Sequence, residues 1–104
     1  MTIILSSYFY LMTPETQLKR QVKQYLNLKG IWHFHNLAGM GVYKGIPDDF
    51  VVHRGKIYGL EYKSPTGKLS PYQEAFKAYW ELHGLGNCIW ITVRNLDDII
   101  SIFK

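Results

Sequence analysis

A chain of 104 residues is about the size of one globular domain, and we predict a single domain over residues 13–104. Hydrophobic residues make up 47% of the sequence and aromatic residues 15%, which is enough for a core and excludes a mainly disordered chain. A lone Cys88 excludes a disulfide framework and fits a reducing cytosol. The apolar stretches are far shorter than the roughly 18 residues that span a bilayer, so we expect a soluble protein without a membrane partner.

The net charge of +4 is unevenly placed along the chain. Residues 1–70 hold nine Lys or Arg against four Asp or Glu, whereas residues 71–104 hold three against four. A basic bias confined to one part of a small domain suits a polyanion such as nucleic acid, although surplus lysine also simply keeps proteins soluble. The lysines that we expect to contact phosphates are Lys19, Lys23, Lys44 and Lys68.

The N-terminal residues 1–11 carry no charge and lack the basic start and cleavage site of a signal peptide. The run Met12-Thr13-Pro14-Glu15 is typical of a helix start, with Thr13 as N-cap and Pro14 at the first helical position. We therefore expect residues 1–12 to be an extension upstream of a native start at Met12. An added edge strand over residues 3–11 is the alternative.

Hydrophobic periodicity predicts the remaining elements in the order helix, three strands, helix, strand. Tyr72, Tyr79 and Trp80 share one face of the second helix, and we expect them in the core. A glycine-rich loop is expected over residues 37–45. The predicted elements are a helix over residues 14–28, strands over 31–36, 50–53 and 57–60, a helix over 70–83, a strand over 88–93 and a terminal helix or strand over 97–103.

The predicted hairpin brings two carboxylates together. With a two-residue turn at residues 54–55, Asp48 lies directly opposite Glu61, whereas a three-residue turn would place Asp49 there instead. Lys63 shares the face of Glu61 because side chains alternate along a strand. Opposed like charges are unfavourable, so we expect a positive charge between them, and two carboxylates suit a hard divalent cation such as Mg²⁺.

Glu15 supplies a further acidic side chain. It falls on the same stripe of the first helix as the apolar residues, and a carboxylate that points inward needs a partner. Each of these residues also has an ordinary explanation. Glu15 could favour the helix N-terminus through the macrodipole, Asp48 could form a turn, and Glu61 with Lys63 could lie on an exposed strand face.

Three stretches together resemble a known signature: Gly45-Ile46-Pro47-Asp48, then Glu61-Tyr62-Lys63, then Gly67-Lys68-Leu69-Ser70-Pro71-Tyr72-Gln73. Their order is similar to that of the PD-(D/E)XK nuclease superfamily, specifically its virus-type replication-repair nuclease branch, the VRR-NUC domain. The resemblance covers residues 13–93. It implies an α/β, restriction-endonuclease-like α-β-β-β-α-β core with a mixed central sheet flanked by helices.

The same resemblance implies a function and the residues that perform it. The activity would be a Mg²⁺- or Mn²⁺-dependent DNA endonuclease, often acting on branched DNA such as Holliday junctions, in a bacterial or phage-infected cell. It also implies that Asp48, rather than its neighbour Asp49, faces Glu61. Asp49 departs from the family, which usually has an apolar residue there. The implied metal ligands are Asp48, Glu61, the Tyr62 carbonyl and Glu15, with Lys63 as the catalytic lysine and Gln73 as a further site residue.

For several side chains the sequence leaves two possible roles open. Gln73 also completes an S-x-x-Q capping box with Ser70, which could be its whole purpose. His33 and His35 lie on one strand face, but no third ligand of matching spacing follows, so we expect them to flank DNA or water rather than zinc. Asn36 belongs to an Asn-x-x-Gly stretch that is similar to one in the family, and we expect it to touch the DNA backbone.

Two expectations concern the whole molecule. Symmetric incision of a four-way junction needs two active sites, so we expect a homodimer. The rival function is a catalytically silent, basic DNA-binding module of the same fold. The paired acids and the lysine argue against the rival, because binding alone gains little from opposed carboxylates.

Overall fold

The computed structural model describes residues 12–36 and 43–104. The predictions for residues 1–11 and most of the loop at 37–45 therefore lie outside the described residues. None of the described helices is long and apolar enough to cross a membrane. The elements are α2 (Pro14–Leu28), β1 (Trp32–His35), β2 (Asp49–His53), β3 (Lys56–Tyr62), α3 (Pro71–Gly84), β4 (Cys88–Val93) and α4 (Asp97–Ile100).

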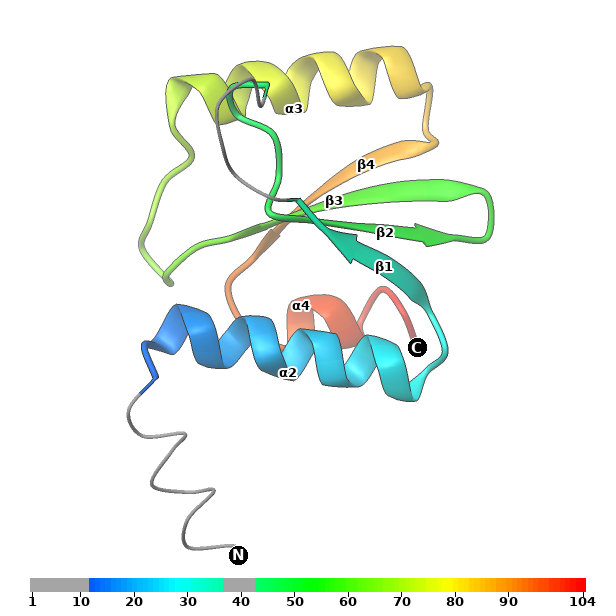
Figure 1. The fold of residues 1–104 in the computed structure, drawn as a ribbon. Helices are drawn as coiled ribbons and strands as arrows, with labels where there is room; N and C mark the ends of the chain where they lie inside the picture. The colour runs from blue at the N-terminus through cyan, green and yellow to red at the C-terminus, as the bar shows by residue number, and fades with distance from the viewer. Residues whose placement is uncertain (1–11, 37–42) are drawn as a thin grey trace, which may run out of the picture.

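The four strands form one mixed sheet in the order β1-β2-β3-β4. The first three strands pair antiparallel, and β4 returns parallel to β3 after the crossover through α3. Helix α3 covers one face of the sheet, and α2 and α4 cover the other (Figure 1). The predicted α-β-β-β-α-β order and the mixed sheet are confirmed, and the terminal segment begins with a helix rather than a strand.

Local sequence explains where the first helix begins and ends. The Thr13 hydroxyl accepts a hydrogen bond from the Thr16 N–H at 3.2 Å, and Pro14 occupies the first turn, where its missing N–H costs nothing. Gly30 follows the helix in the left-handed region, with φ +67°, which only glycine adopts at no steric cost. The predicted bounds of this helix are confirmed.

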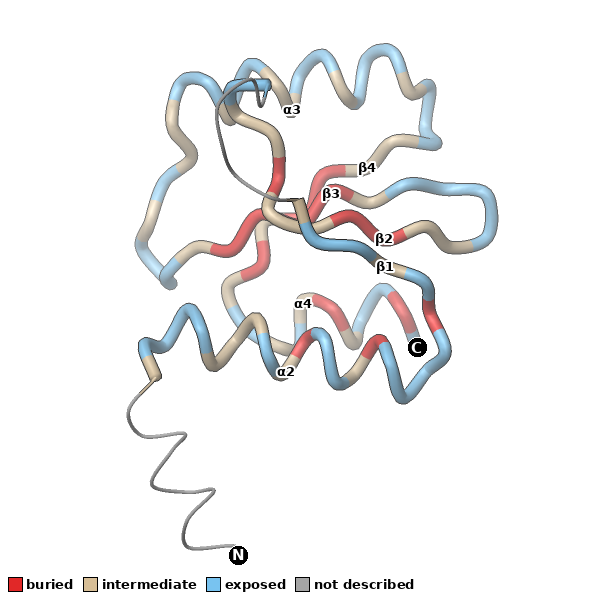
Figure 2. The backbone as a smooth tube through the Cα atoms, viewed as in Figure 1, coloured by how far each residue is buried: buried red, intermediate tan, exposed pale blue. Residues whose placement is uncertain are grey.

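The core lies between the sheet and the pair α2 and α4 (Figure 2). The Tyr25 hydroxyl donates to the Phe103 carbonyl at 2.9 Å and so joins the C-terminus to α2. The fully buried members of this layer come from both helices, three strands and the C-terminal segment after α4: Val22, Leu26, Val51, Leu60, Tyr62, Val93, Ile99 and Phe103.

The α3 face of the sheet is covered far less tightly. No residue of α3 is buried, and Tyr72 and Tyr79 are 57% and 60% exposed, so the expectation that both belong to the core is wrong. Trp80 is half-buried and contacts Phe50, with ring centroids 5.6 Å apart. Within the described part of the chain, only Trp80 of these three aromatic residues is shown in contact with an aromatic ring of the sheet.

Candidate active site

The β2–β3 hairpin sets the position of the two predicted acids. His53 pairs with Lys56 across the turn, and the same register continues to Asp49 opposite Leu60. Arg54 and Gly55 both have positive φ, 51° and 78°, as a two-residue turn of this hand requires. One step further along this register, Asp48 faces Glu61, as predicted, and the three-residue alternative is excluded.

Close packing holds the segment that leads into Asp48. Pro47 is fully buried against Gly59, where an added Cβ would lie 2.6 Å from the proline ring. Gly45 has φ +84° and approaches the start of α3 so closely that an added Cβ would lie 2.1 Å from the Tyr72 carbonyl oxygen. These contacts explain why positions 45 and 59 are glycine.

Two hydrogen bonds then fix Asp48 itself. Its carbonyl accepts from the Asn36 N–H at 2.8 Å, and its carboxylate accepts from the Tyr62 N–H at 3.1 Å. The first bond ties Asp48 to the end of β1, and the second ties it to the end of β3. The backbone of Asp48 is therefore held by the end of β1, and its side chain by the end of β3.

Glu61 is the buried member of the acidic pair. It is 5% exposed, and within residues 12–36 and 43–104 its Oε1 atom has no hydrogen-bond partner. Burial, repulsion from Asp48 and a hydrogen bond with Asp48 together raise the pKa of Glu61 to about 8, against the opposing charges of Lys63 and Lys19. A cation bound between the two carboxylates would pair with this oxygen and reduce the repulsion from Asp48.

The Lys63 backbone lies just past the end of β3, where its N–H donates to the Val93 carbonyl at 3.0 Å. The loop that follows is held by Arg94, whose Nη1 donates to the Ser64 carbonyl at 2.6 Å and to the Gly67 carbonyl at 2.8 Å. Sequence reasoning missed Arg94, because no motif marks an arginine that follows a strand. Arg94 fixes the turn on which Lys63 depends.

Glu15 does not point into the core, so that expectation is wrong. Its side chain is 58% exposed, and its carboxylate lies 3.6 Å from the Lys19 ammonium. It lies in the first turn of α2, at the rim of the core, and lines a hollow of about 500 Å³ that Lys63 also lines. Within residues 12–36 and 43–104, no three His, Cys, Asp or Glu side chains gather closely enough to hold a metal. Glu15 as a metal ligand stays a prediction.

The residues that could hold a metal are therefore Asp48 and Glu61, with the Tyr62 carbonyl as the predicted third donor. Oxygen donors of this kind suit Mg²⁺ or Mn²⁺, and the unpartnered Glu61 oxygen fits such an ion. The Tyr62 side chain points to the opposite face of the sheet, where it joins the core.

Gln73 is engaged in the helix cap that its spacing predicts. Its side-chain oxygen accepts from the Ser70 N–H at 2.9 Å, and its own N–H donates to the Ser70 hydroxyl at 3.2 Å. This reciprocal pair is the capping box of α3. A role for Gln73 in the site stays a prediction.

The predicted DNA-binding residues lie on several elements. Lys19 and Lys23 project from α2 toward a second hollow between this helix and β1. The Lys44 ammonium lies 4.7 Å from the centroid of the Tyr72 ring, and Lys68 is exposed in the loop before α3. The Asn36 N–H is used by Asp48, as described above.

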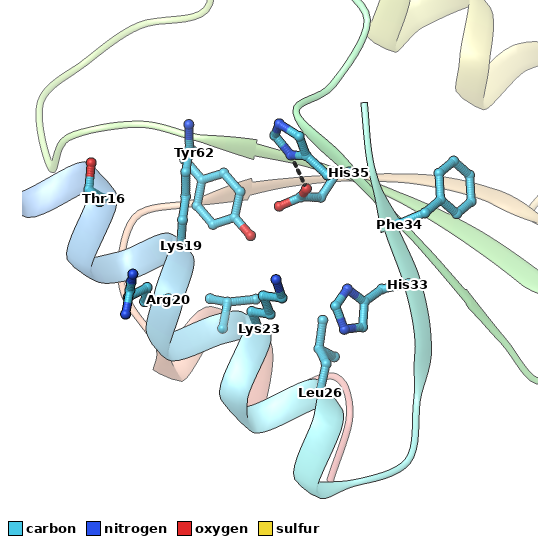
Figure 3. A pocket seen from close by; sticks show the side chains of 11 residues that line it. Thr16, Lys19, Arg20, Lys23, Leu26, His33, Phe34, His35 and Tyr62 are labelled. Atoms are coloured by element: carbon cyan, nitrogen blue, oxygen red, sulfur yellow. Dashed lines mark hydrogen bonds and ion pairs between the residues drawn. The ribbon is translucent and has the colours of Figure 1, made fainter. Parts of the chain in front are cut away.

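Asp49 points away from Asp48, toward α2. Its carboxylate lies 2.6 Å from His35 Nδ1, directly across the β1–β2 pairing (Figure 3). Burial raises the pKa of the Tyr62 phenol, and the charge of Asp49 and a hydrogen bond with it raise the pKa further. The Asp49 carboxylate therefore has its polar partners on the α2 side of the sheet.

Comparison with known proteins supports the fold. A solved structure described as a VRR_NUC domain matches 88% of this chain over 95% of its own length, with a TM-score of 0.71 and 22% sequence identity. No family model matches the sequence, and no curated protein does. The structural likeness agrees with the α-β-β-β-α-β order and the mixed sheet. The chain therefore has the VRR-NUC, restriction-endonuclease-like fold.

Proposed function

We propose that this protein is a divalent-metal-dependent DNA endonuclease that hydrolyses phosphodiester bonds. One observation carries the proposal: Glu61 is buried opposite Asp48, and one of its carboxylate oxygens has no hydrogen-bond partner among the residues that the structure describes. A protein that only binds DNA has no use for this costly arrangement. A nuclease that holds a cation there does, and the nuclease fold adds support.

Each of these residues would have its own role in the reaction. Asp48 and Glu61, with the Tyr62 carbonyl, would hold Mg²⁺ or Mn²⁺. The bound ion would offset the charge of the scissile phosphate and lower the pKa of a water molecule. Lys63 would stabilise the negative charge that develops on the phosphate, and Arg94 would keep the loop after Lys63 in place.

Cleavage of a DNA panel tests this function. The panel contains hairpin, flap, nicked and four-way substrates with Mn²⁺, and each is incubated with the wild type, Glu61→Gln and Lys77→Ala. Lys77 lies on α3 with its ammonium 3.9 Å from Glu81, outside the acidic pair, and serves as the control. We expect the wild type and the control to cleave and Glu61→Gln to be inactive. Binding of DNA by all three proteins without cleavage would support the silent DNA-binding module instead.

We further propose that the protein acts as a homodimer on branched DNA. Support comes from α3, which exposes Tyr79 and Leu82 by 60% and 65% and has no buried residue. A two-fold dimer through this helix would bury apolar surface and bring two sites to one junction. Light scattering at micromolar concentration with paired-nick analysis on a four-way junction tests both points. A monomeric mass with uncoupled single nicks would overturn them.

A further inference from the structure

A second hollow lies on the opposite side of the sheet from the acidic pair, between α2 and the edge strand β1 (Figure 3). Its volume is about 370 Å³. Lys19 and Lys23 reach into it from α2, and His33 and His35 face it from β1. The candidate active site does not use this hollow.

The two imidazoles are each oriented by a neighbour. Nδ1 of His35 lies 2.6 Å from the Asp49 carboxylate, and Nε2 of His33 lies 2.7 Å from the Asn27 side-chain oxygen. Each contact uses one ring nitrogen and leaves the other for a ligand. An imidazolium donates from both nitrogens, so it can keep its protein partner while it binds an anion.

Positive charge exceeds negative charge in this hollow. Among the described residues that line it, Lys19, Arg20 and Lys23 are cationic and Asp49 is acidic, and the Glu15 carboxylate, outside this lining, lies 3.6 Å from the Lys19 ammonium. The Asp49 carboxylate is 17% exposed and already engages His35 and the Tyr62 phenol, so much of its charge is compensated. The Lys19 ammonium lies 5.5 Å from the centroid of the Tyr62 ring, which also lines the hollow.

We infer that this hollow binds one phosphate group of the nucleic acid. Lysine and imidazolium donors that approach from two elements match the oxygens of a tetrahedral anion, and a concave cationic surface concentrates such anions. The inference rests on the proposed function only in naming DNA as the source. The phosphate is either an internal diester or a terminal monoester of the strand, since both present the same oxygens.

Histidine signals test the site directly, because the chain contains its own controls. Inorganic phosphate is titrated into the full-length protein in chelator while the imidazole resonances are followed by NMR. We expect saturable shifts for His33 and His35, and no comparable shifts for His53 at the hairpin or His83 on α3, which lie outside the hollow. Equal small shifts of all four histidines, or no shifts, would overturn the inference.

Oligonucleotide binding then identifies the source of the phosphate. Affinities for a single-stranded oligonucleotide with a 5′-phosphate or a 5′-hydroxyl are measured in chelator for the wild type, Lys23→Ala, His33→Ala and the control Lys77→Ala. We expect Lys23→Ala to bind about tenfold more weakly and to lower the slope of log affinity against log salt by about one. Loss confined to the phosphorylated strand identifies a terminal monoester, and equal loss on both strands identifies an internal diester.

The inference and the proposed function fail in different ways. If Lys23→Ala and His33→Ala bind both strands like the wild type, the hollow is not a phosphate site, even where the wild type cleaves DNA. If the hollow binds phosphate while the panel shows no cleavage, the anion site stands and the nuclease proposal fails. Circular dichroism of each variant confirms that the fold is retained.

Discussion

Asp48 and Asp49 are neighbours in the sequence, yet they meet opposite environments. Asp49 faces α2, where His35 lies 2.6 Å from its carboxylate. Asp48 lies opposite the buried Glu61, whose Oε1 atom has no hydrogen-bond partner in the described part of the chain. The alternation of side chains along β2 separates a carboxylate that is hydrogen-bonded to His35 from the Asp48–Glu61 pair. The two carboxyl groups that a cation could bridge therefore lie on the Asp48 side, and the candidate metal site lies there for that reason.

The two faces of the sheet also differ in how tightly they are packed. Between the sheet and the pair α2 and α4, side chains such as Val51 and Leu60 are fully buried, whereas α3 has no buried residue (Figure 2). The tightly packed face holds the strands in register. The acidic pair lies on the α3 face, where the looser packing leaves room for a ligand.

The largest expected effect is on activity. Lys63→Ala should lower the cleavage rate about 100- to 1000-fold, because the variant lacks a charge that stabilises the transition state. Folding and Mn²⁺-induced stabilisation should remain near those of the wild type, since Lys63 is not among the proposed metal ligands. Single-turnover cleavage and thermal melts measure the two properties. Cleavage near the wild-type rate would contradict the assigned role.

Truncation on the two faces compares their packing directly. Leu26→Ala on α2 removes a side chain that is 1% exposed and should lower the free energy of unfolding by about 2–5 kcal/mol. The matched variant Leu82→Ala on α3 removes a side chain that is 65% exposed and should change it by less than about 0.5 kcal/mol. Urea unfolding of dilute protein gives both values. Similar losses would mean that α3 is packed as tightly as α2.

The raised pKa of Glu61 predicts a pH dependence of stability in the absence of metal. Glutamate in the unfolded chain ionises near pH 4.5, whereas folded Glu61 stays protonated until about pH 8. The unfolded state therefore loses its proton first, and the free energy of unfolding should fall as pH rises from about 4.5 through about 8. Glu61→Gln cannot ionise and should lack this component.

The difference between the wild type and Glu61→Gln isolates this group from the other carboxylates. Urea unfolding in chelator at several pH values provides the comparison. A constant difference across the range would show that Glu61 ionises at its ordinary pKa.

Substitution of Gln73 has the smallest expected effect, and it distinguishes a role in the helix cap from a role in the active site. Glutamate serves equally well at this position of a capping box, so Gln73→Glu should retain the stability of the wild type. Equal cleavage by the variant would limit Gln73 to the cap. Slow cleavage by an equally stable variant would support the site role that the family resemblance implies.

The sequence predicted the elements near the site because their signals are local. Thr13-Pro14 marks a helix start, Arg54-Gly55 marks a two-residue turn, and the register of that turn decides which aspartate faces Glu61. Each of these features depends on neighbours within a few residues, so periodicity and turn chemistry were sufficient.

The features that the sequence did not predict depend on contacts between residues that are far apart in the sequence. The outward direction of Glu15 depends on where the core ends beneath α2, and the exposure of Tyr79 depends on how much of α3 the sheet covers. The His35–Asp49 pair requires the β1–β2 register, which the intervening loop length does not determine. Arg94 reaches a loop about thirty positions away in sequence, for which no local pattern exists.

Calorimetric titration of Mn²⁺ in the absence of DNA tests the central claim most directly, with the wild type and Asp48→Asn compared under the same conditions. The claim is that Asp48 and Glu61 together bind a divalent cation. We expect saturable binding to the wild type, and thermal melts that shift upward with Mn²⁺, because a ligand bound only by the folded state stabilises it. Asp48→Asn should bind far more weakly and show no such shift. Equal binding by both proteins would place the ion elsewhere, and no binding by the wild type would contradict the account.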